Sequence, residues 1–255
     1  MMRIVVKVGS AVLAENDSIA LERMQALVDF LAKLRKNNEV VLVSSGAVAA
    51  GYTKIQLDRS ILTNKQALAS IGQPILMHTY AEKFSQHSII ISQVLLTAAN
   101  LSKAQEISKI KNTVDTLLKN SVLPIINEND ATTTDELEVG DNDQLSAYIT
   151  KHIEADILII LSDIDAYYDK DPRKNSDAKI LKVVNYIDKK DLDKNVTPHG
   201  TFATGGIVTK LKAASYLLQN DIDTFLATGF DLSDIKSYLL DKNHIGGTLF
   251  TKTKS

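Results

Sequence analysis

The sequence contains no cysteine, so it has neither the material for a disulfide framework nor a thiolate nucleophile. Its five histidines, at positions 78, 87, 152, 199 and 244, show no spacing typical of zinc ligands. These two absences argue against a zinc enzyme, and we expect no metal site built by the protein alone.

A basic tail or stripe is also missing. The chain has 29 lysines and arginines against 31 acids, a formal net charge of -2, and these charges are spread along its length. Such a balance does not favour binding to nucleic acid or to an anionic membrane, so we expect a small-molecule partner. No apolar run is long enough to cross a bilayer, and the run at residues 4–8 is too short for a signal peptide. A cytoplasmic location is the expectation.

Linkers, repeats and low-complexity tracts are absent as well. With 255 residues and 44% hydrophobic content, the chain can bury the core of one large α/β domain. We therefore expect residues 1–255 to form a single domain.

Three common catalytic motifs are missing. No two glycines are separated by a single residue, which excludes the dinucleotide fingerprint. Gly46 and Gly51 have the spacing of a P-loop, but Tyr52 and Thr53 follow where lysine and Ser/Thr are required. A serine hydrolase elbow is absent too. What remains are glycine-bearing turns, acids and two lysines, Lys7 and Lys210, and phosphoryl transfer needs little more than positioning and charge neutralisation.

The hydrophobic pattern predicts strands alternating with helices, hence an α/β fold with a mainly parallel sheet. The expected strands are residues 4–8, 39–43, 88–96, 122–126, 156–161, 180–184, 224–227 and 248–250. The expected helices are residues 24–34, 64–87, 107–118 and 208–218. Pro74 is expected to break or kink its helix, and Pro124 conflicts with its strand, because proline belongs at the first position or the edge.

The stretch 122–147 carries the densest group of polar residues that could bind a ligand. An apolar run ends in polar residues 127–130, and a second group of acids and amides, residues 140–143, precedes an expected helix. These groups suit an ammonium, a magnesium-bound nucleotide or two lysines that must be held in place. The alternative is a surface loop with a capped helix. Residues 44–51, small and following a strand, form a candidate anion-binding turn.

Five motifs together resemble the glutamate 5-kinases of the amino acid kinase family. They lie in order along essentially the whole chain, at residues 6–10, 44–51, 127–130, 139–143 and 204–210. The resemblance implies a three-layer αβα sandwich. It also implies ATP-dependent phosphorylation of the γ-carboxylate of L-glutamate, the first step of proline biosynthesis.

The resemblance further implies a role for individual residues. Lys7 and Lys210 would flank the transferred phosphoryl group, and Asp143 would hold both lysines. The N-terminal part would bind glutamate and the C-terminal part ATP, with Mg²⁺ arriving on the nucleotide. The residues expected to bind glutamate are Ser45, Asp130 and Asn142. Those expected to bind ATP are Lys7, Ser162, Asp163, Thr204, Gly205, Gly206, Ile207, Val208, Thr209 and Lys210.

Each assignment has a simpler alternative. Lys7 could lie on an edge strand, Ser45 could only cap a helix, Asp143 could be a first-turn acid, and Lys210 a solvated helix lysine. The family also includes kinases of related carboxylates, and a non-catalytic amino-acid sensor could share the fold.

Two departures from the family pattern affect these expectations. Ala166 stands where the family usually has glycine, and the chain stops where many members continue into a PUA domain, so no PUA domain is expected. The resemblance also implies a homo-oligomer, a dimer or a tetramer, and feedback inhibition by proline.

Overall fold

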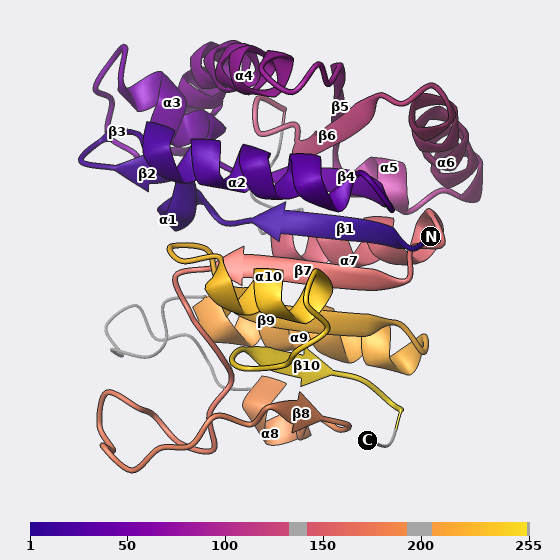
Figure 1. The fold of residues 1–255 in the computed structure, drawn as a ribbon. Helices are drawn as coiled ribbons and strands as arrows, with labels where there is room; N and C mark the ends of the chain where they lie inside the picture. The colour runs from indigo at the N-terminus through magenta and orange to yellow at the C-terminus, as the bar shows by residue number, and fades with distance from the viewer. Residues whose placement is uncertain (133–141, 193–205, 254–255) are drawn as a thin grey trace.

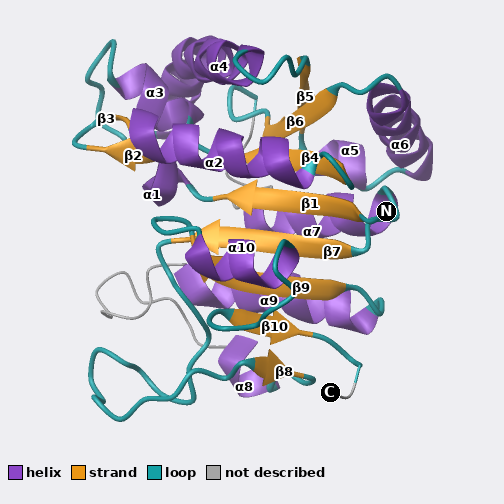
Figure 2. Ribbon diagram, viewed as in Figure 1, coloured by secondary structure: helices purple, strands orange, loops and turns teal. Residues whose placement is uncertain are grey.

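The computed structural model describes residues 1–132, 142–192 and 206–253. Within them, an eight-stranded sheet runs through the molecule with helices on both faces, as Figures 1 and 2 show. Its strand order is β5-β6-β4-β1-β7-β9-β10-β8. The strands are β1 (Arg3–Val8), β4 (Glu39–Ser44), β5 (Ile91–Leu96), β6 (Leu123–Glu128), β7 (Ile157–Ser162), β8 (Val183–Val184), β9 (Asp223–Thr228) and β10 (Thr248–Phe250). This arrangement confirms the predicted α/β sandwich with a mainly parallel sheet.

Strands β5, β6, β4, β1, β7 and β9 are parallel to one another, and β10 is antiparallel to β9 and parallel to β8. Strand β1 lies between β4 and β7, so both of its edges are paired. Its β-branched residues are buried on both faces, as expected for a central parallel strand. The alternative that Lys7 lies on an edge strand is therefore wrong.

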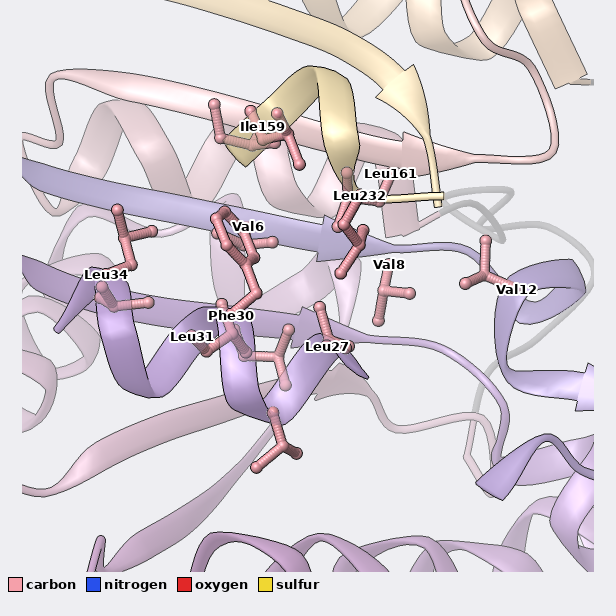
Figure 3. Packing of buried hydrophobic residues seen from close by; sticks show 14 of the residues in the cluster. Val6, Val8, Val12, Leu27, Phe30, Leu31, Leu34, Ile159, Leu161 and Leu232 are labelled. Atoms are coloured by element: carbon pink, nitrogen blue, oxygen red, sulfur yellow. The ribbon is translucent and has the colours of Figure 1, made fainter. Parts of the chain in front are cut away.

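Two layers of helices cover the sheet and enclose two hydrophobic cores. Helices α2 (Leu21–Leu34), α4 (Leu62–Ser85) and α10 (Ser233–Leu239) pack on one face, and α6 (Ala104–Lys119), α7 (Asn142–His152) and α9 (Gly206–Gln219) on the other. Figure 3 shows the first core, where Phe30 and Leu31 of α2 meet Val6 of β1. The short helices are α1 (Ser10–Leu13), α3 (Ala47–Tyr52), α5 (Ala98–Leu101) and α8 (Lys189–Leu192).

Most expected elements are present, and the differences have local causes. Helix α4 continues through Pro74, so the predicted break is wrong, whereas the alternative of a kink stays a prediction. Pro124 is tolerated because it is the second residue of β6, whose pairing with β4 begins only at Ile125. The strand expected at 180–184 is shorter, because Ile180 forms only an isolated bridge with Tyr168 before β8 begins.

Sequence periodicity did not predict the small elements. Strands β2 (Ala14–Glu15) and β3 (Ser18–Ile19) form a hairpin whose turn places Asn16 and Asp17 at positive φ. Helix α10 was also missed, because seven residues are too short to display a helical period.

Helices α3 and α4 pack with their backbones nearly in contact. A Cβ atom on Gly51 would overlap the carbonyl of Leu68, and one on Gly72 would overlap the carbonyl of Ala47. Glycine is therefore required at both positions. This close packing fixes the start of α3 against α4, next to the turn that follows β4.

The parallel strands bring their carboxyl ends to the same edge of the sheet. Gly9 follows β1 at this edge and donates its backbone N–H to the carbonyl of Leu161 in β7 at 3.0 Å. Ser45 follows β4 and donates to the carbonyl of Val8 at 3.2 Å. Ligands of open parallel sheets bind in the crevice beyond this edge, so the candidate site lies here. In the described part of the chain, no helix has the length and apolarity needed to cross a membrane.

Candidate active site

Two lysines from opposite ends of the sequence meet one carboxylate at the carboxyl edge of the sheet. Lys7 Nζ of β1 lies 2.5 Å from Asp143 Oδ1, and Lys210 Nζ of α9 lies 3.0 Å from Asp143 Oδ2. The residues are 4%, 0% and 6% exposed for Lys7, Asp143 and Lys210. The alternative that Lys210 is a solvated surface lysine is therefore wrong.

The electrostatics of this triad follow from its burial and its charge count. Burial alone would raise the pKa of Asp143, but the attraction of Lys7 and Lys210 outweighs it and holds the pKa below its usual range. An ionised Asp143 between two ammonium groups leaves one net positive charge. Because isolated charges are expensive to bury, this excess positive charge favours an anion beside the two lysines.

Helices α7 and α9 both begin at this triad, and hydrogen bonds join them. Thr209 Oγ1 donates to Asp143 Oδ2 at 2.9 Å, and Gln144 Nε2 donates to the carbonyl of Thr209 at 3.4 Å. Lys210 Nζ also donates to the carbonyl of Gly206 at 2.8 Å, one helical turn earlier. Asp143 thus lies in the first turn of α7, where a helix favours an acid, and also fixes the start of α9.

A network of side-chain amides borders the triad on the β4 and β6 side. Asn142 Nδ2 donates to Ser45 Oγ at 2.7 Å and to Asn127 Oδ1 at 3.0 Å. Asn127 Nδ2 donates to Gln73 Oε1 of α4 at 2.9 Å. Ser45 does not cap α3, because Gly46 is the N-cap residue, so that alternative is wrong. Among the described residues, none donates a hydrogen bond to the buried Asn142 Oδ1.

A cavity of about 200 Å³ opens beside this network between α4 and the ends of β5 and β6. Its polar lining comes from Ser70, Gln73, Gln93, Glu128, Asn129 and Asp130. Burial raises the pKa of Asp130 to about 6. No described cation forms an ion pair with Asp130, and a carboxylate kept partly out of water in this way is suited to receive a positively charged group from a ligand.

Apart from Lys7 in β1, the described residues expected to bind the nucleotide lie on the β7 and α9 side of the sheet. Ser162 ends β7, and its hydroxyl donates to Asp163 Oδ1 at 2.7 Å, so the serine is turned toward an exposed acid. Ala166 is buried and has no positive φ, so the backbone there does not require the glycine that the family usually has.

Residues 206–210 form the first turn of α9, with Gly206 and Ile207 partly exposed and Val208 buried. Thr204 and Gly205 lie outside the described residues. The hydroxyl of Thr209 is bonded to Asp143, so Thr209 contacts the triad itself.

Sequence reasoning did not single out three residues that structure this site. Asn127 was noted only as part of a polar cluster, whereas its buried side chain joins Asn142 to Gln73. Gln73 lies one residue before Pro74, and the sequence pattern there indicated only a possible helix break at the proline. Tyr80 of α4 is completely buried, and its hydroxyl lies 2.9 Å from Ser44 Oγ. A buried tyrosine hydroxyl needs a partner, but a sequence does not reveal which one.

Comparison with known proteins shows the family to which the chain belongs. A model of the "Amino acid kinase family" matches residues 2–228. Glutamate 5-kinase of Leishmania donovani is 50% identical over 248 residues, covering 97% of this chain and 94% of that protein. Glutamate 5-kinase of Wolinella succinogenes is 49% identical over 257 residues, covering 99% and 98%.

Among solved structures, an isopentenyl phosphate kinase is 17% identical, with a TM-score of 0.69 over 98% of this chain and 100% of the other. At that identity the likeness concerns the fold alone. The match of the family model and the identity with the two relatives extend over nearly the whole chain. The chain therefore belongs to the amino acid kinase family and, within it, to the glutamate 5-kinases.

Proposed function

We propose that this site transfers the γ-phosphoryl group of ATP to the γ-carboxylate of L-glutamate, giving L-glutamyl 5-phosphate, the first step of proline biosynthesis. The relatives named above are glutamate 5-kinases, which are phosphotransferases with a carboxyl group as acceptor. The observation that carries the proposal is the buried pair of lysines sharing one carboxylate at the carboxyl edge of the sheet.

In the proposed mechanism, Lys7 and Lys210 hold the transferred phosphoryl group between them. Negative charge spreads over the equatorial oxygens of this group as the bond to ADP breaks, and donors fixed beforehand stabilise it without reorganising. Asp143 fixes both ammonium groups and acts as a positioning residue. The oxygens of the phosphoryl group would accept hydrogen bonds from Lys7 and Lys210 and neutralise the net positive charge of the triad.

Glutamate would lie in the N-terminal part of the chain. Asp130 would receive its ammonium in the cavity beside β6. Asn142 Oδ1, to which no described residue donates, offers a further acceptor. The Ser45 hydroxyl and the backbone amides of the turn after it would meet the γ-carboxylate.

ATP would lie in the C-terminal part, against the ends of β7 and α9. Ser162, Asp163 and the first turn of α9 would border it. Thr204 and Gly205, which lie outside the described residues, stay predicted ATP-binding residues. The start of a helix directs its backbone N–H groups and the positive end of its dipole toward a phosphate, and the start of α9 would do so here. Mg²⁺ would enter as part of the MgATP substrate, because no cluster of three or more metal-ligating side chains occurs in the described ranges.

Two alternatives within the fold are distinguishable. A kinase of a related carboxylate would keep the triad but phosphorylate another acceptor. A non-catalytic sensor would have no need of two lysines sharing one buried carboxylate, and the intact triad favours catalysis.

The acceptor is tested by incubating the protein with MgATP and a panel of carboxylates and trapping acyl phosphates with hydroxylamine. We expect trapped product with glutamate. Trapped product with acetylglutamate or aspartate but none with glutamate would overturn the substrate assignment. No product with any acceptor would favour the sensor.

Replacing Lys7 or Lys210 by alanine should lower kcat by on the order of a hundredfold or more, with a smaller change in the KM for glutamate. The reason is that each substitution removes a cation that stabilises charge in the transition state. Lys212→Ala, on the exposed face of the same helix α9, is the matched control and should leave kcat unchanged. If thermal unfolding showed that the lysine variants are simply unfolded, the separate catalytic role would lose its support.

Asp130→Asn should raise the KM for glutamate by about ten- to a hundredfold, the loss expected for one charged hydrogen bond, with little change in kcat. In the unsubstituted protein, the KM for glutamate should rise as the pH falls through about 6, because the protonated carboxyl no longer attracts an ammonium. This pH dependence should disappear in Asp130→Asn. A KM that is independent of pH between 5 and 7 (roughly one unit on either side of this pKa) would contradict the assignment.

The same substitution should stabilise the folded protein at neutral pH, by on the order of 1 kcal/mol. Folding raises the pKa of Asp130, so the ionised carboxylate destabilises the folded protein. This destabilisation is complete above the folded-state pKa of about 6 and absent below the pKa in the unfolded chain. The gain in Tm should therefore be present at pH 7 and vanish near pH 4, about the pKa of an unperturbed aspartate. Thermal unfolding at the two pH values measures it.

Proline should compete with glutamate, because it shares the α-carboxylate and amino group but lacks the side-chain carboxylate. Inhibition through a shared site needs no second domain. Initial rates at several proline concentrations should show a rising apparent KM for glutamate at constant kcat. Unaltered rates at millimolar proline, or inhibition that saturating glutamate cannot relieve, would rule out the shared site.

We also propose a homo-oligomer, a dimer or a tetramer, which sedimentation would reveal.

A further inference from the structure

A buried hydroxyl pair lies directly beneath the turn that follows β4. Tyr80 Oη of α4 lies 2.9 Å from Ser44 Oγ, and both residues are completely buried. Ser44 Oγ in turn donates to the backbone carbonyl of Ser45 at 2.9 Å. The pair therefore connects helix α4 to the peptide bond between Ser45 and Gly46.

The direction of these hydrogen bonds is determined by the number of protons. A serine hydroxyl carries a single proton, and Ser44 gives it to the carbonyl of Ser45. The proton between the two hydroxyls must then come from Tyr80. Burial raises the pKa of Tyr80 well above its usual value, so the phenol remains neutral and remains a donor throughout the physiological pH range.

The carbonyl of Ser45 fixes the direction of the next backbone amide. Along β4, Val40 and Leu42 belong to the core under α2 and α4, whereas Val41 and Val43 belong to the core under α7. Ser44 continues the first of these faces, so the carbonyl of Ser45 is held toward α4. In a planar trans peptide the N–H points opposite to the C=O, which directs the Gly46 N–H toward α7 and the crevice.

The conformation of Gly46 and the contacts of Asn142 support this orientation. Gly46 has a φ of 109°, a conformation that side-chain-bearing residues rarely adopt. Asn142 of α7 reaches the same turn from the crevice side, where its Nδ2 lies 2.7 Å from Ser45 Oγ. The turn is thus held by α4 from below and by α7 from the side where a substrate would lie.

We propose that Tyr80 and Ser44 are positioning residues that aim the Gly46 N–H at the carboxylate that accepts the phosphoryl group. This inference deepens the proposed function and rests on it for the identity of the acceptor. The ring of Tyr80 packs on Phe84, with centroids 6.1 Å apart, so the ring belongs to the core while the hydroxyl orients the turn. The Gly46 amide hydrogen-bonds the acceptor in the ground state and the transition state alike, and leaves the ATP site unaffected.

The inference predicts a specific kinetic pattern for variants that remove the two hydroxyls. Ser44→Ala should lower kcat/KM for glutamate by about tenfold, mainly through KM, with the KM for ATP within about twofold of the unsubstituted protein. Tyr80→Phe should have a smaller effect of about threefold, because Ser44 can still donate to Ser45. The double variant should be no worse than Ser44→Ala, since both hydroxyls act through one carbonyl. Ser44→Thr keeps the hydroxyl and should restore activity.

Ser237→Ala is the matched control. Ser237 is also a buried serine whose hydroxyl donates to a backbone carbonyl at 2.9 Å, that of Asn243, but it lies on α10 away from the turn. Ser237→Ala should lower Tm by about 2 to 4 °C, and Ser44→Ala by more, because it also leaves the buried Tyr80 hydroxyl without its acceptor. Only Ser44→Ala should change the kinetics for glutamate. The inference would be overturned by equal kcat/KM values for glutamate in the two variants. It would also be overturned if the KM for ATP rose in parallel with the KM for glutamate in Ser44→Ala.

A measurement that does not depend on catalysis separates this inference from the proposed function. In glycine-labelled protein, which contains 11 glycines, the amide resonance of Gly46 should move in Ser44→Ala and stay in place in Ser237→Ala. It should also shift when glutamate is added to the unsubstituted protein. If the protein phosphorylates another carboxylate, glutamate is wrong as the acceptor. The predicted changes in kcat/KM for the variants then apply to that other carboxylate. An unmoved Gly46 resonance in Ser44→Ala would overturn the positioning role itself.

Discussion

The structure depends most on one buried carboxylate shared by two lysines. Lys7 comes from the first strand, Asp143 from the middle of the chain and Lys210 from the last third, so the ion pairs join distant parts of the sequence. Taking three charged groups out of water costs free energy that their mutual attraction only partly returns, and removing one partner from a buried ion pair typically costs about a further 3 to 5 kcal/mol. Two cations for one anion leave a positive charge that an incoming phosphoryl group can neutralise. Binding of that group thus completes the electrostatics of the site.

In the proposed function, the same triad would separate the positions of the two substrates. It occupies the carboxyl edge of β1, the strand between the β4–β6 side and the β7–β9 side of the sheet. Amides and a carboxylate with a raised pKa line the first side, which suits a zwitterionic amino acid. The start of α9 and the end of β7 form the second side, which suits phosphates. An acceptor and a donor on opposite sides would meet at the lysines.

Much of this arrangement could be predicted from the sequence, because buried parallel strands and amphipathic helices have strong periodic patterns. The pattern was misleading at Pro74, since α4 is held by close backbone packing at Gly72 rather than by local preference alone. Polar groups that directly follow an apolar strand emerge at its carboxyl edge, and the structure places Asn127 at the end of β6 beside Asn142 at the start of α7. Their role in binding a substrate stays a prediction.

The pairings within the site could not be predicted in this way. Nothing in the sequence indicates that Gln73 meets Asn127 or that Tyr80 meets Ser44, because these contacts depend on how α4 crosses the sheet. The pairing of Asp143 with both lysines came from resemblance to a family, whereas the structure supplies its distances and burial. Short elements such as α10 and the β2–β3 hairpin lacked enough residues to show a period.

The central claim is that Lys7 and Lys210 together hold the group in transfer. Its most direct test is a crystal structure of the protein with MgADP, glutamate and aluminium fluoride, which mimics that group. The account predicts that the planar aluminium fluoride group lies between the two lysines, with each Nζ within hydrogen-bond distance of a fluorine, about 3 Å. Asp143 should still be bound to both lysines. A fluoride group contacted by only one of the lysines, or a structure in which Asp143 has released either of them, would contradict it.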